Sequence, residues 1–146
     1  MFADLLNRLI TSQPERLPQP DAQVALAALL VRVARADGDY AAAEIDKIDK
    51  ILAARHGLSP FEAAKLRGQA ETLESEAPDT VRFTRAIKDA VDLEDRTAIV
   101  EALWAVVLAD GERDHDEDTF LRMVANLLGI NDRDSNFARQ RAAKRG

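Results

Sequence analysis

Apolar residues along this chain recur at spacings of three and four, the period of an amphipathic helix, and alternating strand-like runs are nearly absent. The pattern predicts an all-α protein. We expect a bundle of seven or eight helices near residues 2–12, 20–36, 41–56, 60–77, 79–92, 95–109, 115–128 and 132–143. A length of 146 residues fits a single domain over residues 1–146.

Capping residues and glycines set several of these boundaries. Ser59, Pro60 and Glu62 have the spacing of a capping box with proline at the first helical position, so a helix is expected to begin at Pro60. Gly57 and Gly129 each follow a long amphipathic segment, where a glycine in the left-handed conformation commonly ends a helix.

Two of the predicted helices are apolar on nearly every side. Within residues 24–36 the charged side chains before the turn are Arg32 and Arg35, and within residues 98–109 the charged side chain is Glu101. Helices of this kind lie in the middle of a bundle, so Trp104 is expected in the core. Because an unpaired buried charge is costly, Arg32 and Glu101 are interpreted as partners of each other.

Each of the two apolar helices is the first element of one copy of an internal repeat. Each ends in Ala-Asp-Gly followed by an acid, at residues 36–39 and 109–112, and a glutamate stands seven residues after each aspartate. Each copy closes with glycine and a branched apolar residue, at 57–58 and 129–130. The chain is therefore predicted to hold a helix–acidic turn–helix pseudo-repeat, with halves at about 22–58 and 95–130. An approximate two-fold axis between the halves would bring both turns to one end of the bundle.

Composition and charge exclude several functions. The net charge is −6, and residues 110–118 alone carry six acids against Arg113, which argues against nucleic-acid binding through a basic surface. The chain has no cysteine and two histidines, so disulfides, thiolate sites and multi-histidine metal centres are excluded. No transmembrane segment is expected, because the longest apolar runs are too short, and residues 1–10 lack a signal-peptide pattern. A cytoplasmic location is the resulting expectation.

Through the two Ala-Asp-Gly motifs of the repeat, the sequence resembles the TerB-like family, which is named for tellurite-resistance proteins. The resemblance rests on Ala-Asp-Gly-Asp at 36–39 with Glu44 and on Ala-Asp-Gly-Glu at 109–112 with Glu117, and it runs from about Ala22 to Arg141. It implies an all-helical fold, clustered acids proposed as a metal site, and an association with tellurite resistance and stress response. It implies no known catalytic reaction. Arg113 departs from the family, which usually has an apolar residue there.

The acids of the two turns are the candidate metal ligands. They are Asp37, Asp39, Glu44, Asp110, Glu112 and Glu117. Oxygen ligands suit Ca²⁺ or Mg²⁺, with Zn²⁺ ranked behind them. The two glutamates fall near helix N-termini, where capping and the helix dipole also explain them. The aspartates at 37 and 110 fall at helix C-termini, which disfavour anions, and their recurrence there is the physical argument for a function. A purely structural and solubilising role for all of these acids stays open beside it.

Other local signals are weaker. An EF-hand is excluded, because the twelfth residue from Asp110 is Leu121. His115 is interpreted as a solvated loop residue. His56 is placed at a helix C-terminus, where a charged imidazole is favoured. The basic C-terminal tail at 139–146 is interpreted as a frayed helix end, with contact to an acidic partner or a membrane surface as the alternative.

We therefore predict a non-enzymatic, acidic domain of TerB type that binds a divalent cation and takes part in stress-related sensing or interaction. Two alternatives remain open. A metal-dependent hydrolase would use the same carboxylates and would need a concave pocket at the turns. A purely protein-binding scaffold, with a partner that the sequence does not identify, would expose an apolar patch near the amphipathic segment 2–10.

Overall fold

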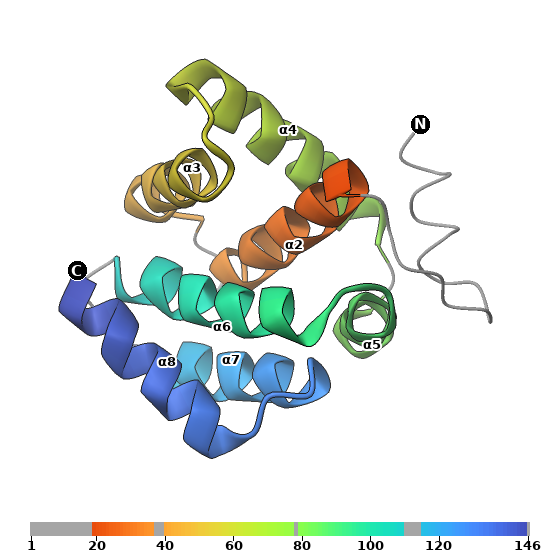
Figure 1. The fold of residues 1–146 in the computed structure, drawn as a ribbon, viewed down its shortest axis with the longest axis vertical. Helices are drawn as coiled ribbons and strands as arrows, with labels where there is room; N and C mark the ends of the chain where they lie inside the picture. Colours follow the sequence, from red (N-terminus) through yellow and green to blue (C-terminus); the bar gives the residue numbers. More distant parts are fainter. Residues whose placement is uncertain (1–18, 37–39, 78, 110–114, 146) are drawn as a thin grey trace.

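The fold is all-helical, as the hydrophobic pattern predicts (Figure 1). The computed structural model describes residues 19–36, 40–77, 79–109 and 115–145. Within these ranges it contains seven helices and no strand. They are α2 (Gln19–Ala34), α3 (Ala42–His56), α4 (Pro60–Glu76), α5 (Thr80–Ala90), α6 (Leu93–Leu108), α7 (His115–Leu127) and α8 (Asp132–Arg145). The helix expected at 2–12 lies outside the described residues.

The predicted caps are confirmed. Ser59 Oγ accepts a hydrogen bond from the Glu62 N–H (3.1 Å), and Glu62 Oε1 accepts one from the Ser59 N–H (2.9 Å), which completes the capping box of α4. Gly57 and Gly129 have φ angles of 65° and 83° and are the two residues with positive φ in the described part of the chain. After each, the next N–H bonds back to the carbonyl five residues earlier, as in a Schellman C-cap.

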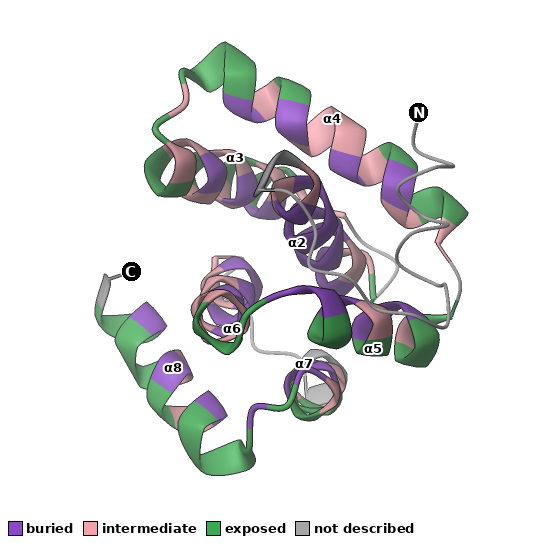
Figure 2. Ribbon diagram, turned by 45° about the vertical axis from the view of Figure 1, so that its right-hand side comes forward, coloured by how far each residue is buried: buried purple, intermediate pink, exposed green. Residues whose placement is uncertain are grey.

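The two apolar helices, α2 and α6, form the centre of the bundle. Helix α2 packs against α3, α4, α5, α6 and α7, and Figure 2 shows it buried along most of its length. Trp104 of α6 is 0% exposed, which confirms its predicted place in the core. Helix α2 buries side chains all round because its neighbours cover its faces, as its lack of polar positions requires. Helix α6 is covered on most of its surface, whereas its Ala98, Ala102 and Ala105 are half-buried.

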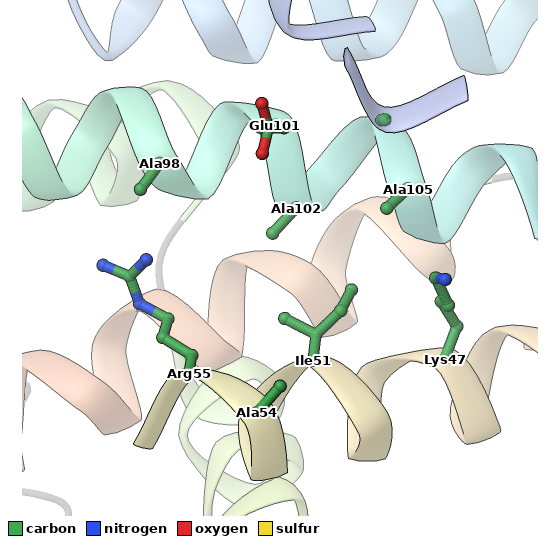
Figure 3. Close-up of a pocket in the computed structure, with 9 residues that line it drawn as sticks. Lys47, Ile51, Ala54, Arg55, Ala98, Glu101, Ala102 and Ala105 are labelled. Atoms are coloured by element: carbon green, nitrogen blue, oxygen red, sulfur yellow. The ribbon is translucent and has the colours of Figure 1, made fainter. Parts of the chain in front are cut away.

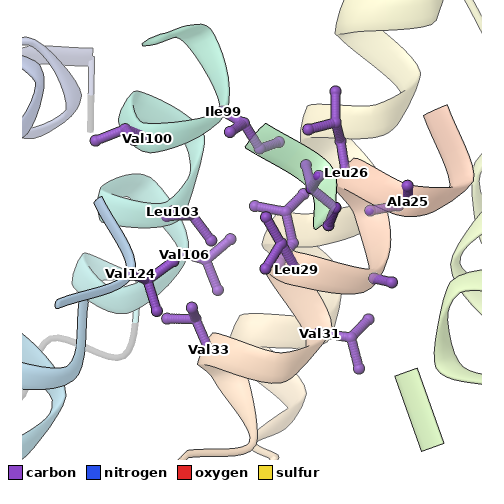
Figure 4. Close-up of a cluster of buried hydrophobic side chains, with 14 of the residues drawn as sticks. Ala25, Leu26, Leu29, Val31, Val33, Ile99, Val100, Leu103, Val106 and Val124 are labelled. Atoms are coloured by element: carbon purple, nitrogen blue, oxygen red, sulfur yellow. The ribbon is translucent and has the colours of Figure 1, made fainter. Parts of the chain in front are cut away.

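Helices α2 and α6 run side by side in the same direction (Figure 4). Ile99, Leu103 and Val106 of α6 follow one another down the helix, as Leu26, Leu29 and Val33 do on α2. The C-terminal ends of the two helices therefore lie at the same end of the core. The acidic turns that continue from these ends, at 37–39 and 110–114, lie outside the described residues.

The correspondence between the halves continues into α4 and α8, further than the sequence motifs indicate. Helix α4 packs on α2 as α8 packs on α6. Asn131 caps α8 by accepting a hydrogen bond from the Asp134 N–H (2.8 Å), at the place that Ser59 occupies before α4. Buried positions also match at a spacing of 72 residues. The matched pairs are Ala63 with Ser135, Leu66 with Ala138, and Ala70 with Ala142.

Helix α5 lies against both halves. It packs on α2 and α7, and its Phe83 and Ile87 side chains are 0% exposed. Its apolar face is narrow and regular, which suits a short helix that covers a seam between two others.

The basic residues at the C-terminal end belong to α8, which extends to Arg145. Arg141 forms an ion pair with Glu101 of α6, and the Arg139 guanidinium lies 5.9 Å from the centre of the Trp104 ring. Packing onto α6 holds this segment, since Ala138 and Ala142 are buried. Among the described helices, none is long and apolar enough to cross a bilayer.

Candidate functional site

The candidate site consists of the two acidic turns and the helices that lead into and out of them. Of the six candidate ligands, Asp37, Asp39, Asp110 and Glu112 lie outside the described residues. Glu117 lies on α7, but its side chain is also outside them. Within the described part of the chain, His, Asp and Glu side chains do not gather in any group of three that could hold a metal ion. Glu44 is the candidate ligand whose side chain lies within the described residues, at the start of one of the helices that flank the first turn.

Glu44 is a buried carboxylate at the start of α3. It is 0% exposed, and its Oε1 atom accepts a hydrogen bond from the N–H of Ala41 at 3.4 Å. A full capping box has a second hydrogen bond, from the backbone N–H of the third helical residue to the N-cap side chain. Ala41 has no side-chain acceptor, so only the bond from its own N–H to Glu44 is present. The helix dipole favours an anion at this position, so capping accounts for part of the burial. Sequence reasoning identified Glu44 but gave no reason to expect it fully buried.

The end of α2 before the first turn is tied to α4 by an ion pair that sequence reasoning did not identify. Arg32 Nη2 lies 3.0 Å from Glu74 Oε2, and Arg35 Nη1 lies 2.7 Å from Glu74 Oε1. The side chains of Arg32 and Glu74 are about one-eighth exposed, so the pair is largely shielded from water. The predicted Arg32–Glu101 pairing is wrong, because α4 covers Arg32 whereas α8 covers Glu101.

The start of α3 after the turn is tied to α4 as well. The Tyr40 hydroxyl donates a hydrogen bond to Glu71 Oε2 (2.9 Å). Burial and this carboxylate raise the pKa of Tyr40 above its ordinary value, so the phenol stays protonated and remains a donor. The guanidinium of Arg35 lies 4.9 Å from the centre of the Tyr40 ring, so the residues on either side of the turn touch each other.

A second arginine connects α3 to the same acid. Arg67 Nε donates to Asp49 Oδ1 (2.6 Å), and its Nη1 donates to Glu71 Oε2 (3.1 Å). Asp49 raises the pKa of Arg67. Together with Tyr40, these contacts make a polar network in which α4 holds both helices that flank the first turn.

Among the described residues, the second half has no such network at the matching positions. At a spacing of 73 residues, Ala105 and Leu108 stand where Arg32 and Arg35 stand in the first half. Helix α8 is attached to α6 instead through the buried Trp104 Nε1, which donates to Ser135 Oγ at 3.0 Å. The two turns therefore continue from helices that are secured in different ways.

A groove lies between α3, α6 and α8 (Figure 3). It encloses about 400 Å³, and Ile51 and alanine side chains line most of it. Lys47 and Arg55 lie at its two ends, and the carboxylate in its lining, Glu101, is bound to Arg141. A groove lined mainly by methyl groups suits an apolar side chain rather than a metal ion.

The two histidines do not add ligands to the described site. His56 is the last residue of α3, and burial and the nearby Arg55 cation lower its pKa. The expectation of a charged imidazole is therefore wrong, since desolvation outweighs the helix dipole here. His115 begins α7 rather than lying in a loop, and its side chain is outside the described residues.

Comparison with known proteins gives one relationship. A family model described as "Tellurite resistance protein TerB" matches residues 23–140, which is most of the chain. The matched region includes both acidic turns, most of α2, all of α3 to α7 and most of α8. Neither the curated proteins nor the solved structures contain a match.

Proposed function

The chain belongs to the TerB family of tellurite resistance proteins, and on that premise we propose that it is a non-enzymatic cytoplasmic domain that binds a divalent cation. The ligands are carboxylates from both acidic turns, and the cation is Ca²⁺ or Mg²⁺, because the candidate set consists of oxygen donors. Binding serves sensing or protein interaction in the stress and tellurite-resistance response. The residues are Asp37, Asp39, Glu44, Asp110, Glu112 and Glu117.

The observation that carries this proposal is the burial of Glu44. A carboxylate at 0% exposure has lost the water that surrounds it in the unfolded chain, and burial of a charge is costly unless nearby groups compensate it. A cation bound in the adjoining turn would favour the ionised form of the same group. Capping alone does not require complete burial, since the capping glutamate of α4, Glu62, is exposed.

Two further features support a shared site. Because α2 and α6 end at the same end of the core, the chain enters both turns from neighbouring positions (Figure 4). The contact between Arg35 and Tyr40 also fixes the separation of the chain before and after the first turn. Ligands held on such a frame lose less conformational entropy when a cation binds.

A titration of the amide NMR signals tests the proposal. Ca²⁺ and Mg²⁺, added separately to millimolar concentration, are expected to shift the signals of Gly38 and Gly111 together, with one apparent affinity. The double variant Asp37→Asn, Asp110→Asn is expected to weaken binding at least tenfold, and Glu44→Gln is expected to weaken it as well. Asp46→Asn is the matched control, because Asp46 is exposed on the same helix.

Several outcomes would overturn the proposal. The first is a titration that leaves both glycine signals unmoved. The second is a double variant that binds the cation as well as the parent does. The third is an Asp46→Asn variant that weakens binding as much as Glu44→Gln does. No described feature favours the hydrolase alternative, because the groove between α3, α6 and α8 is lined by alanines and its carboxylate is already paired.

A further inference from the structure

The groove between α3 and α6 corresponds to a surface that is covered in the other half of the molecule. The repeat relates α2 to α6 and α3 to α7, so the seam between α3 and α6 corresponds to the seam between α7 and α2. Helix α5 packs on both α7 and α2 and covers that second seam. The matching seam is open among the described residues and forms the 400 Å³ groove.

The glycine caps show the same difference between the halves. A Cβ atom placed on Gly129, at the end of α7, would lie 3.2 Å from Lys88 Cε of α5 and 2.9 Å from Arg96 Nη1. A Cβ atom placed on Gly57, at the end of α3, would meet nothing within 4 Å. The end of α7 is therefore covered by α5 and the start of α6, whereas the end of α3 is open in the described part of the chain.

The position of α5 in the chain indicates what would fill the open seam. Helix α5 directly precedes α6, so its counterpart would directly precede α2, in the residues before Gln19. Residues 2–10 have apolar side chains at positions 2, 5, 6, 9 and 10, a helical spacing. Helix α5 has the same kind of face, with buried or half-buried apolar residues at 83, 86, 87 and 90.

The segment carries apolar side chains, and the groove has a mainly apolar lining. Residues 11–18 separate this segment from α2, and eight residues can extend to about 26 Å. The groove offers alanine methyl groups along α6 and Ile51 on α3, so leucine and phenylalanine side chains would bury apolar surface there. We propose that residues 2–10 form an amphipathic helix that packs into the groove between α3 and α6, as α5 packs between α7 and α2.

Disulfide trapping tests this packing directly, because the chain has no cysteine of its own. The double variant Leu6→Cys, Ala54→Cys places one thiol on the apolar face of the segment and one in the groove. Mild oxidation is expected to give a monomer with an internal disulfide. Leu6→Cys paired with Lys65→Cys, on the exposed face of α4, is the matched control and is expected to stay reduced.

Two results would overturn the proposal at this step. One is equal internal cross-linking of the groove pair and the control pair, which would show that residue 6 samples the whole surface. The other is a groove pair that forms only disulfide-linked dimers, which would show that a second copy of the chain supplies the helix.

Limited proteolysis gives an independent measurement that leaves the groove intact. Trypsin is expected to cleave after Arg8 at least tenfold faster in the variant Leu5→Ser, Leu9→Ser than in the parent, because the serines remove the apolar contacts. Asn7→Ser lies on the polar face of the same segment and is expected to leave the rate unchanged. Equal cleavage of the parent and the double variant would contradict the packing.

Discussion

Trp104 Nε1 of α6 donates a hydrogen bond to Ser135 Oγ of α8 at 3.0 Å, with both residues at most 1% exposed. The matching positions in the first half are Val31 and Ala63, which are apolar and equally buried. At this position in the junction between an inner and an outer helix, the second half therefore has a buried hydrogen bond and the first half has apolar packing.

Ser135→Ala is expected to lower the free energy of unfolding by about 1–3 kcal/mol, because it leaves the indole N–H without its partner. Urea denaturation measures the change. Ser135→Ala is expected to cost much less in the background of Trp104→Phe, where the donor is already absent. An equal cost in both backgrounds would show that the hydrogen bond does not account for the effect.

Glu74→Gln is expected to destabilise the protein by about 2 kcal/mol, because it leaves the largely buried Arg32 guanidinium without a countercharge. Chemical denaturation followed by circular dichroism gives the change. Glu76→Gln, on the exposed side of the same helix, is the control and is expected to change stability by less than about 0.5 kcal/mol. Similar losses in the two variants would contradict a specific role for the pair.

Alanine at the glycines is expected to have three different effects. Gly57→Ala should cost about 1 kcal/mol through its left-handed φ of 65° alone. Gly129→Ala should cost more, since its Cβ would also press on Arg96, which donates to the Leu128 carbonyl. Gly68→Ala, inside α4 with open space around it, should stabilise by about 0.5–1 kcal/mol. Thermal melts of the three variants check the order, and an equal shift for Gly57 and Gly129 would contradict it.

His56 is expected to make stability depend on pH in one direction. Burial and Arg55 lower its pKa in the folded protein, so the unfolded chain takes up a proton first as the pH falls. The stability that the neutral His56 imidazole contributes is therefore fully present above about pH 6.5, the ordinary pKa of histidine. It is lost progressively as the pH falls from there to the lower pKa of His56 in the folded protein. Denaturation at a series of pH values should show a smaller loss in His56→Gln than in the parent. A parallel pH dependence in the two proteins would contradict the assignment.

Helix positions were predictable from the sequence because each depends on local signals. The capping box at Ser59 and the glycine at 57 act within one turn of the helix ends that they fix. The inner position of α2 and α6 was also predictable, since helices without a polar face need neighbours on every side.

The partners of the charged residues were not predictable in the same way. Arg32 was correctly expected to need an acid, but which acid it meets depends on which helix covers that face. The pairing of Arg32 with Glu74 and of Glu101 with Arg141 follows from α4 lying on α2 and α8 lying on α6. The burial of Glu44 depends in the same manner on the packing around α3. The sequence motif identifies Glu44 as a candidate without indicating how far it is removed from water.

The central position of α2 has a consequence for how the protein opens. Since α2 packs on α3, α4, α5, α6 and α7, its amides can exchange with solvent deuterium only when most of the bundle separates. Helix α8 packs on α6 and α7 and carries few buried side chains, so it can detach while the remaining helices stay assembled. The backbone amides of α8 would therefore lose their protection from hydrogen exchange at a lower free energy of opening than those of α2. A cooperative unit that contains α2 would stay folded after α8 has detached.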